Sequence, residues 1–206
     1  CLYGVMPANG LLYAPPNPCA CYQEAKSMGF NAMAPAADGP RIPEDAANAE
    51  RWAKGPAYGS IPAEETTDED WPTYRHDAAR SGYATTSVPA TLEQAWTQNL
   101  GGELTSPVVA GGRFFVASID THTLHALDAE FGKLLWKFTA GGRIDSPPTI
   151  YGGLALFGCT DGYVYALRAS DGVLAWRFLA APMDQRVMAL EQLESVWPVH
   201  GSVLVQ

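Results

Sequence analysis

The chain has 206 residues, 47% of them hydrophobic, and a formal net charge of −9 at pH 7. Its 13 Lys and Arg residues are scattered, whereas nucleic-acid-binding domains cluster such residues to neutralise phosphates, so the composition argues against a nucleic-acid partner. No apolar run approaches the roughly 18 residues that a membrane-spanning helix needs, and no membrane span is predicted.

The first part of the chain, residues 1–35, contains two short β-like segments at residues 10–13 and 30–33. The second of these aligns with residues 124–127 and 164–167, which belong to a repeat that is described below. We therefore interpret residues 1–35 as the divergent remnant of one repeat unit.

The cysteines in this part suggest a covalent link. Cys1 is expected to pair with Cys19 or Cys21 if the protein resides in an oxidising compartment. A three-thiolate metal site is the alternative, although structural zinc takes four ligands and no nearby His supplies the fourth. Cys1 as the acylated first residue of a lipoprotein is a further alternative, which the blade-like sequence after it disfavours. Cys159 stands alone and is expected to be a small buried apolar residue.

Residues 36–69 have the composition of a linker. Ala, Pro, Gly and acidic residues dominate, and an acidic run follows at residues 64–70. One short helix is predicted at residues 44–54, begun by Pro43 and ended by Gly55. The acidic run is expected to keep the segment solvated, because its spacing does not follow the loop motif of a calcium site.

The rest of the chain is built from a repeat with a period of about 40 residues. Tryptophans recur at this period, and Ala and Gly residues between them match in register. The matching positions are Trp96, Trp136 and Trp176, Ala126 and Ala166, and Gly132 and Gly172. We expect the tryptophans to pack between neighbouring units, since an indole buries a large apolar area.

Each repeat unit contains four short apolar or alternating segments separated by turn residues, which is typical of β-strands. In the first unit they are residues 107–110, 113–119, 123–129 and 134–139. Glycine pairs and Asp-Gly dipeptides lie between them, where hairpin turns require a positive φ. The predicted fold is therefore all-β, a partial β-propeller of four-stranded blades preceded by the remnant and the linker.

The sequence motif of the repeats resembles that of a known family. Residues 126–136 and 166–176 resemble the tryptophan-docking motif of PQQ-binding-like, or quinoprotein and BamB-type, propellers, Ala-x-Asp-x-x-Thr-Gly-x-x-x-Trp. The sequence departs from that pattern at Phe131, Arg168 and Asp171.

The resemblance covers residues 70–206. Residues 70–82 are similar to the segment that introduces the first blade in this family, and two complete blades follow. After an insertion at residues 180–194, residues 195–205 are expected to form the opening strand of a third blade.

The family includes dehydrogenases that bind pyrroloquinoline quinone (PQQ) and non-enzymatic scaffolds of the BamB type. The resemblance implies a periplasmic or otherwise exported protein. The favoured interpretation is a non-catalytic module that binds a protein or polysaccharide through the propeller face and contacts further blades of the same parent chain. The alternative is part of a quinoprotein alcohol or sugar dehydrogenase, with PQQ and Ca²⁺ on the propeller axis.

Candidate site residues lie in the loop before the innermost strand of the second unit. In a propeller this loop opens toward one mouth of the channel, so Arg143 could hold a cofactor carboxylate, and Asp145 could bind a cation or act as a base. Trp197, His200 and Arg186 are further candidates for the same mouth. The alternative is that Arg143 and Asp145 pair with each other or cap the loop. No adjacent Cys-Cys pair, haem-attachment motif or metal-ligand set is evident.

The sequence has no initiator Met and begins and ends within partial units. It is therefore expected to be an interior fragment of a longer protein, with any signal peptide or lipid anchor outside it.

Overall fold

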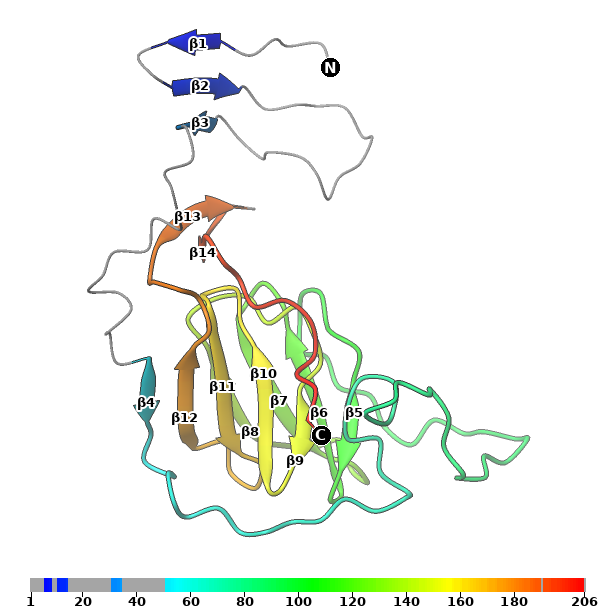
Figure 1. Cartoon of the computed structure of the whole chain (residues 1–206). Helices are drawn as coiled ribbons and strands as arrows, with labels where there is room; N and C mark the ends of the chain where they lie inside the picture. Colours follow the sequence, from blue (N-terminus) through cyan, green and yellow to red (C-terminus); the bar gives the residue numbers. More distant parts are fainter. Residues whose placement is uncertain (1–5, 9–10, 15–30, 35–50, 190, 206) are drawn as a thin grey trace. The chain divides into compact units, whose positions relative to one another are not determined.

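The structure is a computed structural model that describes residues 6–8, 11–14, 31–34, 51–189 and 191–205. Within these residues the regular elements are all strands, and no helix is long and apolar enough to cross a membrane. The chain divides into two compact units, residues 1–44 and 45–206. Figure 1 shows the strands of both units.

The smaller unit contains a three-stranded antiparallel sheet in the order β1-β2-β3. Its strands are β1 (Met6–Ala8), β2 (Leu11–Ala14) and β3 (Asn31–Met33), and Leu12 lies opposite Met33. Both predicted β segments are thus confirmed as neighbouring strands. The predicted pairing among Cys1, Cys19 and Cys21 lies outside the described residues.

The larger unit contains two successive antiparallel sheets, which are blades of a partial β-propeller (Figure 1). The strands of the first blade are β5 (Val108–Ala110), β6 (Arg113–Ser118), β7 (Thr123–Asp128) and β8 (Leu134–Thr139). Those of the second are β9 (Thr149–Tyr151), β10 (Leu154–Gly158), β11 (Tyr163–Arg168) and β12 (Leu174–Leu179). The strand predictions from the repeat are confirmed.

The main core lies between these two blades. Period-2 alternation places Ala155 and Phe157 of β10 in that core, where Phe157 stacks on Tyr165 at a centroid separation of 5.2 Å. Leu154 and Leu156 point to the opposite face, which is covered by residues 57–61 and by Val203 and Val205. The second blade is therefore buried on both faces.

The repeated tryptophans dock each blade on the next. The indole N–H of Trp136 donates to the carbonyl of Ala169 at 3.0 Å, and its ring lies against Gly172. Trp96 makes the same contacts one repeat earlier, with Ala129 at 3.1 Å and with Gly132. This confirms the packing role expected from the repeat.

The third tryptophan, Trp176, contacts a strand that the sequence did not predict. Its ring stacks on Trp52 with centroids 4.6 Å apart, and Trp52 belongs to β4 (Trp52–Lys54), which pairs with β12. Arg51 extends this contact by donating to the carbonyls of Leu179 and Ala180 at the end of β12. The predicted helix at residues 44–54 is therefore wrong over residues 52–54, because these residues satisfy their backbone groups at the open edge of β12.

The segment after β4 returns to the innermost strands. Trp71 exchanges two backbone hydrogen bonds with Val109 of β5, and the carbonyl of Pro72 accepts from the N–H of Ile150 of β9 at 2.7 Å. Residues 71–72 thus join the inner edges of both blades, which lie next to each other.

The predicted insertion at residues 180–194 forms a hairpin, with strands β13 (Arg186–Ala189) and β14 (Gln192–Ser195). Residues 195–205 are expected from the sequence to open a third blade, but Ser195 ends β14, and residues 196–205 pair with no strand of the described residues. They instead run along the second blade, where the hydroxyl of Thr149 donates to the carbonyl of Val203 at 2.5 Å.

Gly172→Ala should destabilise the larger unit by about 2–4 kcal/mol. Gly172 has a φ of +74°, which disfavours an L-residue, and a Cβ there would lie 2.5 Å from the Trp136 ring. Gly152 is the matched control, since its φ is +55° but no atom lies within 4 Å of an added Cβ. Gly152→Ala should lose only about 1 kcal/mol. Urea unfolding of both variants measures the difference, and equal losses would argue against tight docking of Trp136.

Candidate functional site

The loop before β9 carries the predicted cofactor ligand Arg143, which is engaged in a buried ion pair. Its guanidinium contacts the carboxylate of Glu194 in β14, with Nε 2.6 Å from Oε1. The side chains are only 13% and 6% exposed. Breaking such a pair leaves an uncompensated charge away from water, so this interaction holds the hairpin on the blades.

The second predicted ligand, Asp145, is bonded through Oδ2 to Nδ1 of His200, another of the predicted residues. The structure therefore brings Asp145 and His200 together. Trp197 is 38% exposed and its backbone N–H donates to Ser195, whereas Arg186 pairs with Asp184. Arg143 and Asp145 do not pair with each other, because each has a partner from the insertion or from the segment after it.

The hairpin is also joined to the turns of both blades. His122, in the turn between β6 and β7, contacts Gln192 at 2.5 Å, and the N–H of Ser195 donates to the carbonyl of Thr160 in the second blade. Sequence reasoning missed Glu194 and Gln192 as partners. The insertion has no counterpart in the other repeat, so no repeated position could reveal them.

A buried polar cluster lies beneath this hairpin. Asp161 is 2% exposed and accepts hydrogen bonds from the Tyr165 hydroxyl at 2.6 Å and the Tyr163 N–H at 3.0 Å. Burial, reinforced by the Asp161 charge, raises the pKa values of Tyr165 and the Cys159 thiol above their usual ranges. Cys159 is fully buried, as predicted, and a thiol held protonated in this way is a poor nucleophile.

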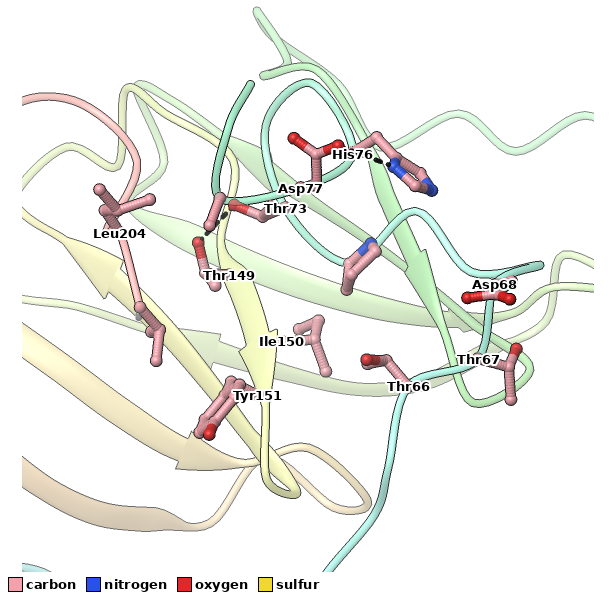
Figure 2. Close-up of a pocket in the computed structure, with 13 residues that line it drawn as sticks. Thr66, Thr67, Asp68, Thr73, His76, Asp77, Thr149, Ile150, Tyr151 and Leu204 are labelled. Carbon is pink, nitrogen blue, oxygen red and sulfur yellow. Dashed lines mark hydrogen bonds and ion pairs between the residues drawn. The ribbon is translucent and has the colours of Figure 1, made fainter. Parts of the chain in front are cut away.

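A separate pocket of about 260 Å³ lies at the inner edge of the second blade (Figure 2). The segment at residues 66–78, strand β9 and residues 204–205 line it. Thr73 and Thr149 are buried and their hydroxyls are hydrogen-bonded to each other at 2.8 Å. An adjoining pocket of about 430 Å³ shares Thr66 and Tyr151 with the first.

The titratable groups of these pockets are mainly acidic. They are Glu64, Glu65, Asp68, His76, Asp77 and Tyr151, and the lining contains no Lys or Arg. Glu64 is paired with Arg113 at 2.9 Å. Hydrogen bonds from Ser81, side chain first and then backbone, lower the pKa of Asp77 to about 2, so this carboxylate is ionised at neutral pH.

The acidic run at residues 64–70 does not converge on a single point. Asp70 accepts from the N–H groups of Thr67 and Gly111, which makes it a turn-capping residue. Over the described ranges, no group of three or more His, Cys, Asp or Glu is placed to hold a metal ion.

Comparison with known proteins gives a family match over most of the larger unit. Residues 82–204 match the family described as outer membrane protein assembly factor BamB. No curated protein matches the chain.

Three solved structures are similar at low identity. Quinohemoprotein alcohol dehydrogenase from Comamonas testosteroni is 24% identical, with a TM-score of 0.45, over 54% of this chain and 19% of that one. BamB from Moraxella catarrhalis is 21% identical, with a TM-score of 0.33, over 34% and 21%. A europium-containing methanol dehydrogenase is 19% identical, with a TM-score of 0.48, over 56% and 24%. The matched region thus spans at most about a quarter of those chains.

Arg143→Met should lower the free energy of unfolding by about 3 kcal/mol, because it leaves the Glu194 carboxylate buried without its cation. The double variant Arg143→Met, Glu194→Gln should lose less free energy of unfolding than Arg143→Met alone, since the side-chain amide introduced at position 194 carries no charge. Urea unfolding of both single variants and the double variant gives the coupling energy. Strictly additive losses would contradict the pairing.

Ser81→Ala should raise the pKa of Asp77 from about 2 toward its ordinary value of 3.8, because it removes the side-chain hydrogen bond that is the largest cause of the lowering, while the backbone N–H of residue 81 still donates. The lowered pKa stabilises the folded state above about pH 4, and this contribution is lost as pH falls through about 2. A ¹³C NMR titration of the Asp77 carboxyl measures the shift. Ser87→Ala, in the same exposed segment, should leave it unchanged.

Proposed function

The chain belongs to the family of the outer membrane protein assembly factor BamB, and on this premise we propose that it is a non-catalytic, exported propeller module that binds a protein or polysaccharide partner. The family description concerns assembly of outer membrane proteins, which supports a binding role and a location outside the cytoplasm. Two blades cannot close a ring alone, since propellers typically have four or more, so the partners include further blades of a parent chain.

The observation that carries this proposal is the ion pair between Arg143 and Glu194. An arginine that is to hold a cofactor carboxylate must keep its guanidinium fork available. Here Glu194 occupies that fork, and the hairpin residues Glu194 and Ser195 are themselves buried against the blades. The hairpin therefore acts as a structural cover over the loop.

The same contacts argue against a PQQ and Ca²⁺ site built from the predicted residues. Asp145, the predicted cation ligand or base, is bonded to His200, and its remaining Oδ1 is buried without a partner. A cation there would need several more oxygen ligands. Arg143, Asp145 and His200 thus do not fit the cofactor in their present arrangement, and the quinoprotein dehydrogenase remains the alternative.

Calorimetric titration of PQQ with Ca²⁺ into the chain, followed by a dye-linked alcohol oxidation assay, tests the proposal. We expect neither saturable binding nor turnover for the wild-type protein. Glu194→Gln, which weakens the hold on Arg143, is the informative variant and should also fail to bind. Micromolar binding of PQQ, strengthened in Glu194→Gln and abolished in Arg143→Met, would overturn the proposal and assign Arg143 to the cofactor.

A further inference from the structure

We infer that the two adjoining pockets beside β9 form one groove that binds an extended basic segment of a partner protein. This inference rests on the proposed binding function and narrows the partner to a protein segment rich in Lys or Arg. Figure 2 shows Thr66, Ile150 and Tyr151 around the hollow of the first pocket. The second pocket continues it past Thr66 and Tyr151 toward Glu65.

The charge of the groove selects a cation. Asp68, Asp77 and Glu65 line it, and none of them is paired with Lys or Arg among the described residues. His76, 3.6 Å from Asp77, is the one basic side chain in the described lining. Glu65 and Asp68 are exposed, so their unpaired charges attract positively charged ligands and repel acidic ones, most strongly at low salt.

The backbone of β9 offers an acceptor for an extended chain. Thr149 and Tyr151 pair with β10, so the N–H and C=O of Ile150 point away from that strand, as the antiparallel pattern requires. The Ile150 N–H donates to Pro72, but proline has no N–H to return.

The carbonyl of Ile150 consequently has no donor among the described residues, and Ile150 lines the first pocket. Buried carbonyls are nearly always hydrogen-bonded. A backbone N–H of a segment that enters the pocket would satisfy this one beside Pro72, which holds the rest of this edge.

An aromatic side chain completes the groove. Tyr151 is 58% exposed and lines both pockets, so its ring can contact a basic side chain that lies between them. Backbone pairing, carboxylates and an aromatic face together fit an alternating sequence of basic and apolar residues.

Fluorescence anisotropy with a labelled peptide of alternating Lys and Val tests the inference on the full chain at low salt. We expect saturable binding that weakens as salt is raised. Glu65→Gln with Asp68→Asn should weaken binding about threefold to tenfold. Tyr151→Leu should weaken it about twofold to fivefold.

The matched control is Asp120→Asn with Glu130→Gln, which removes the same charge from exposed turns of the first blade. It should change affinity less than twofold, and equal weakening by both double variants would overturn the inference as nonspecific attraction. Absence of saturable binding, or equal binding of a Glu-Val peptide, would also overturn it.

Preferential binding of a neutral dextran would overturn the basic-peptide assignment while leaving the partner-binding module in place. Only binding of PQQ with turnover would contradict the proposed non-catalytic module. Failure of the basic-peptide inference and failure of the proposed function are therefore distinguishable.

Discussion

The spacing of the blades depends on one contact, the docking of a tryptophan from one blade on the glycine turn of the next. The Trp136 indole donates to Ala169, and its ring occupies the space that a side chain at Gly172 would fill. Burying an indole of roughly 200 Å² contributes about 5 kcal/mol at most. Since the hydrogen bond fixes the ring's direction as well, the packing of the core between the blades depends on this contact.

Propeller blades leave strand edges open, and here one segment closes several of them. Residues 51–54 pair with the outer edge of the second blade, and residues 71–72 pair with the inner edges of both. Open edges are sites of unwanted association, so a segment that covers them limits it. The exception is the carbonyl of Ile150, to which Pro72 cannot donate because proline has no N–H. The groove lies beside this carbonyl.

The sequence predicts the blades well because every unit repeats the same local signals. Gly132 and Gly172 mark positive-φ turns, and the tryptophans mark the interfaces. Strand β4 could not be predicted in this way, since a three-residue strand exists only by virtue of its distant partner. The candidate site shows the same limit, because Arg143 is bonded to a residue 51 positions later in an unrepeated insertion. Periodicity reveals what neighbours share, whereas long-range pairs between unique residues leave no periodic trace.

The segment that covers the edges also determines the order in which parts of the larger unit can fold during synthesis. Arg51 emerges from the ribosome well before Leu179, the residue 128 positions later whose carbonyl it bonds. Until then, the backbone groups of β4 have no strand to pair with, even if the first blade has already collapsed. Contacts of such long sequence separation slow folding, since the loop between them must close first. The larger unit therefore completes its edges last, and a ribosome that pauses before residue 174 holds a chain with an exposed Trp52 and an unoccupied place for β12.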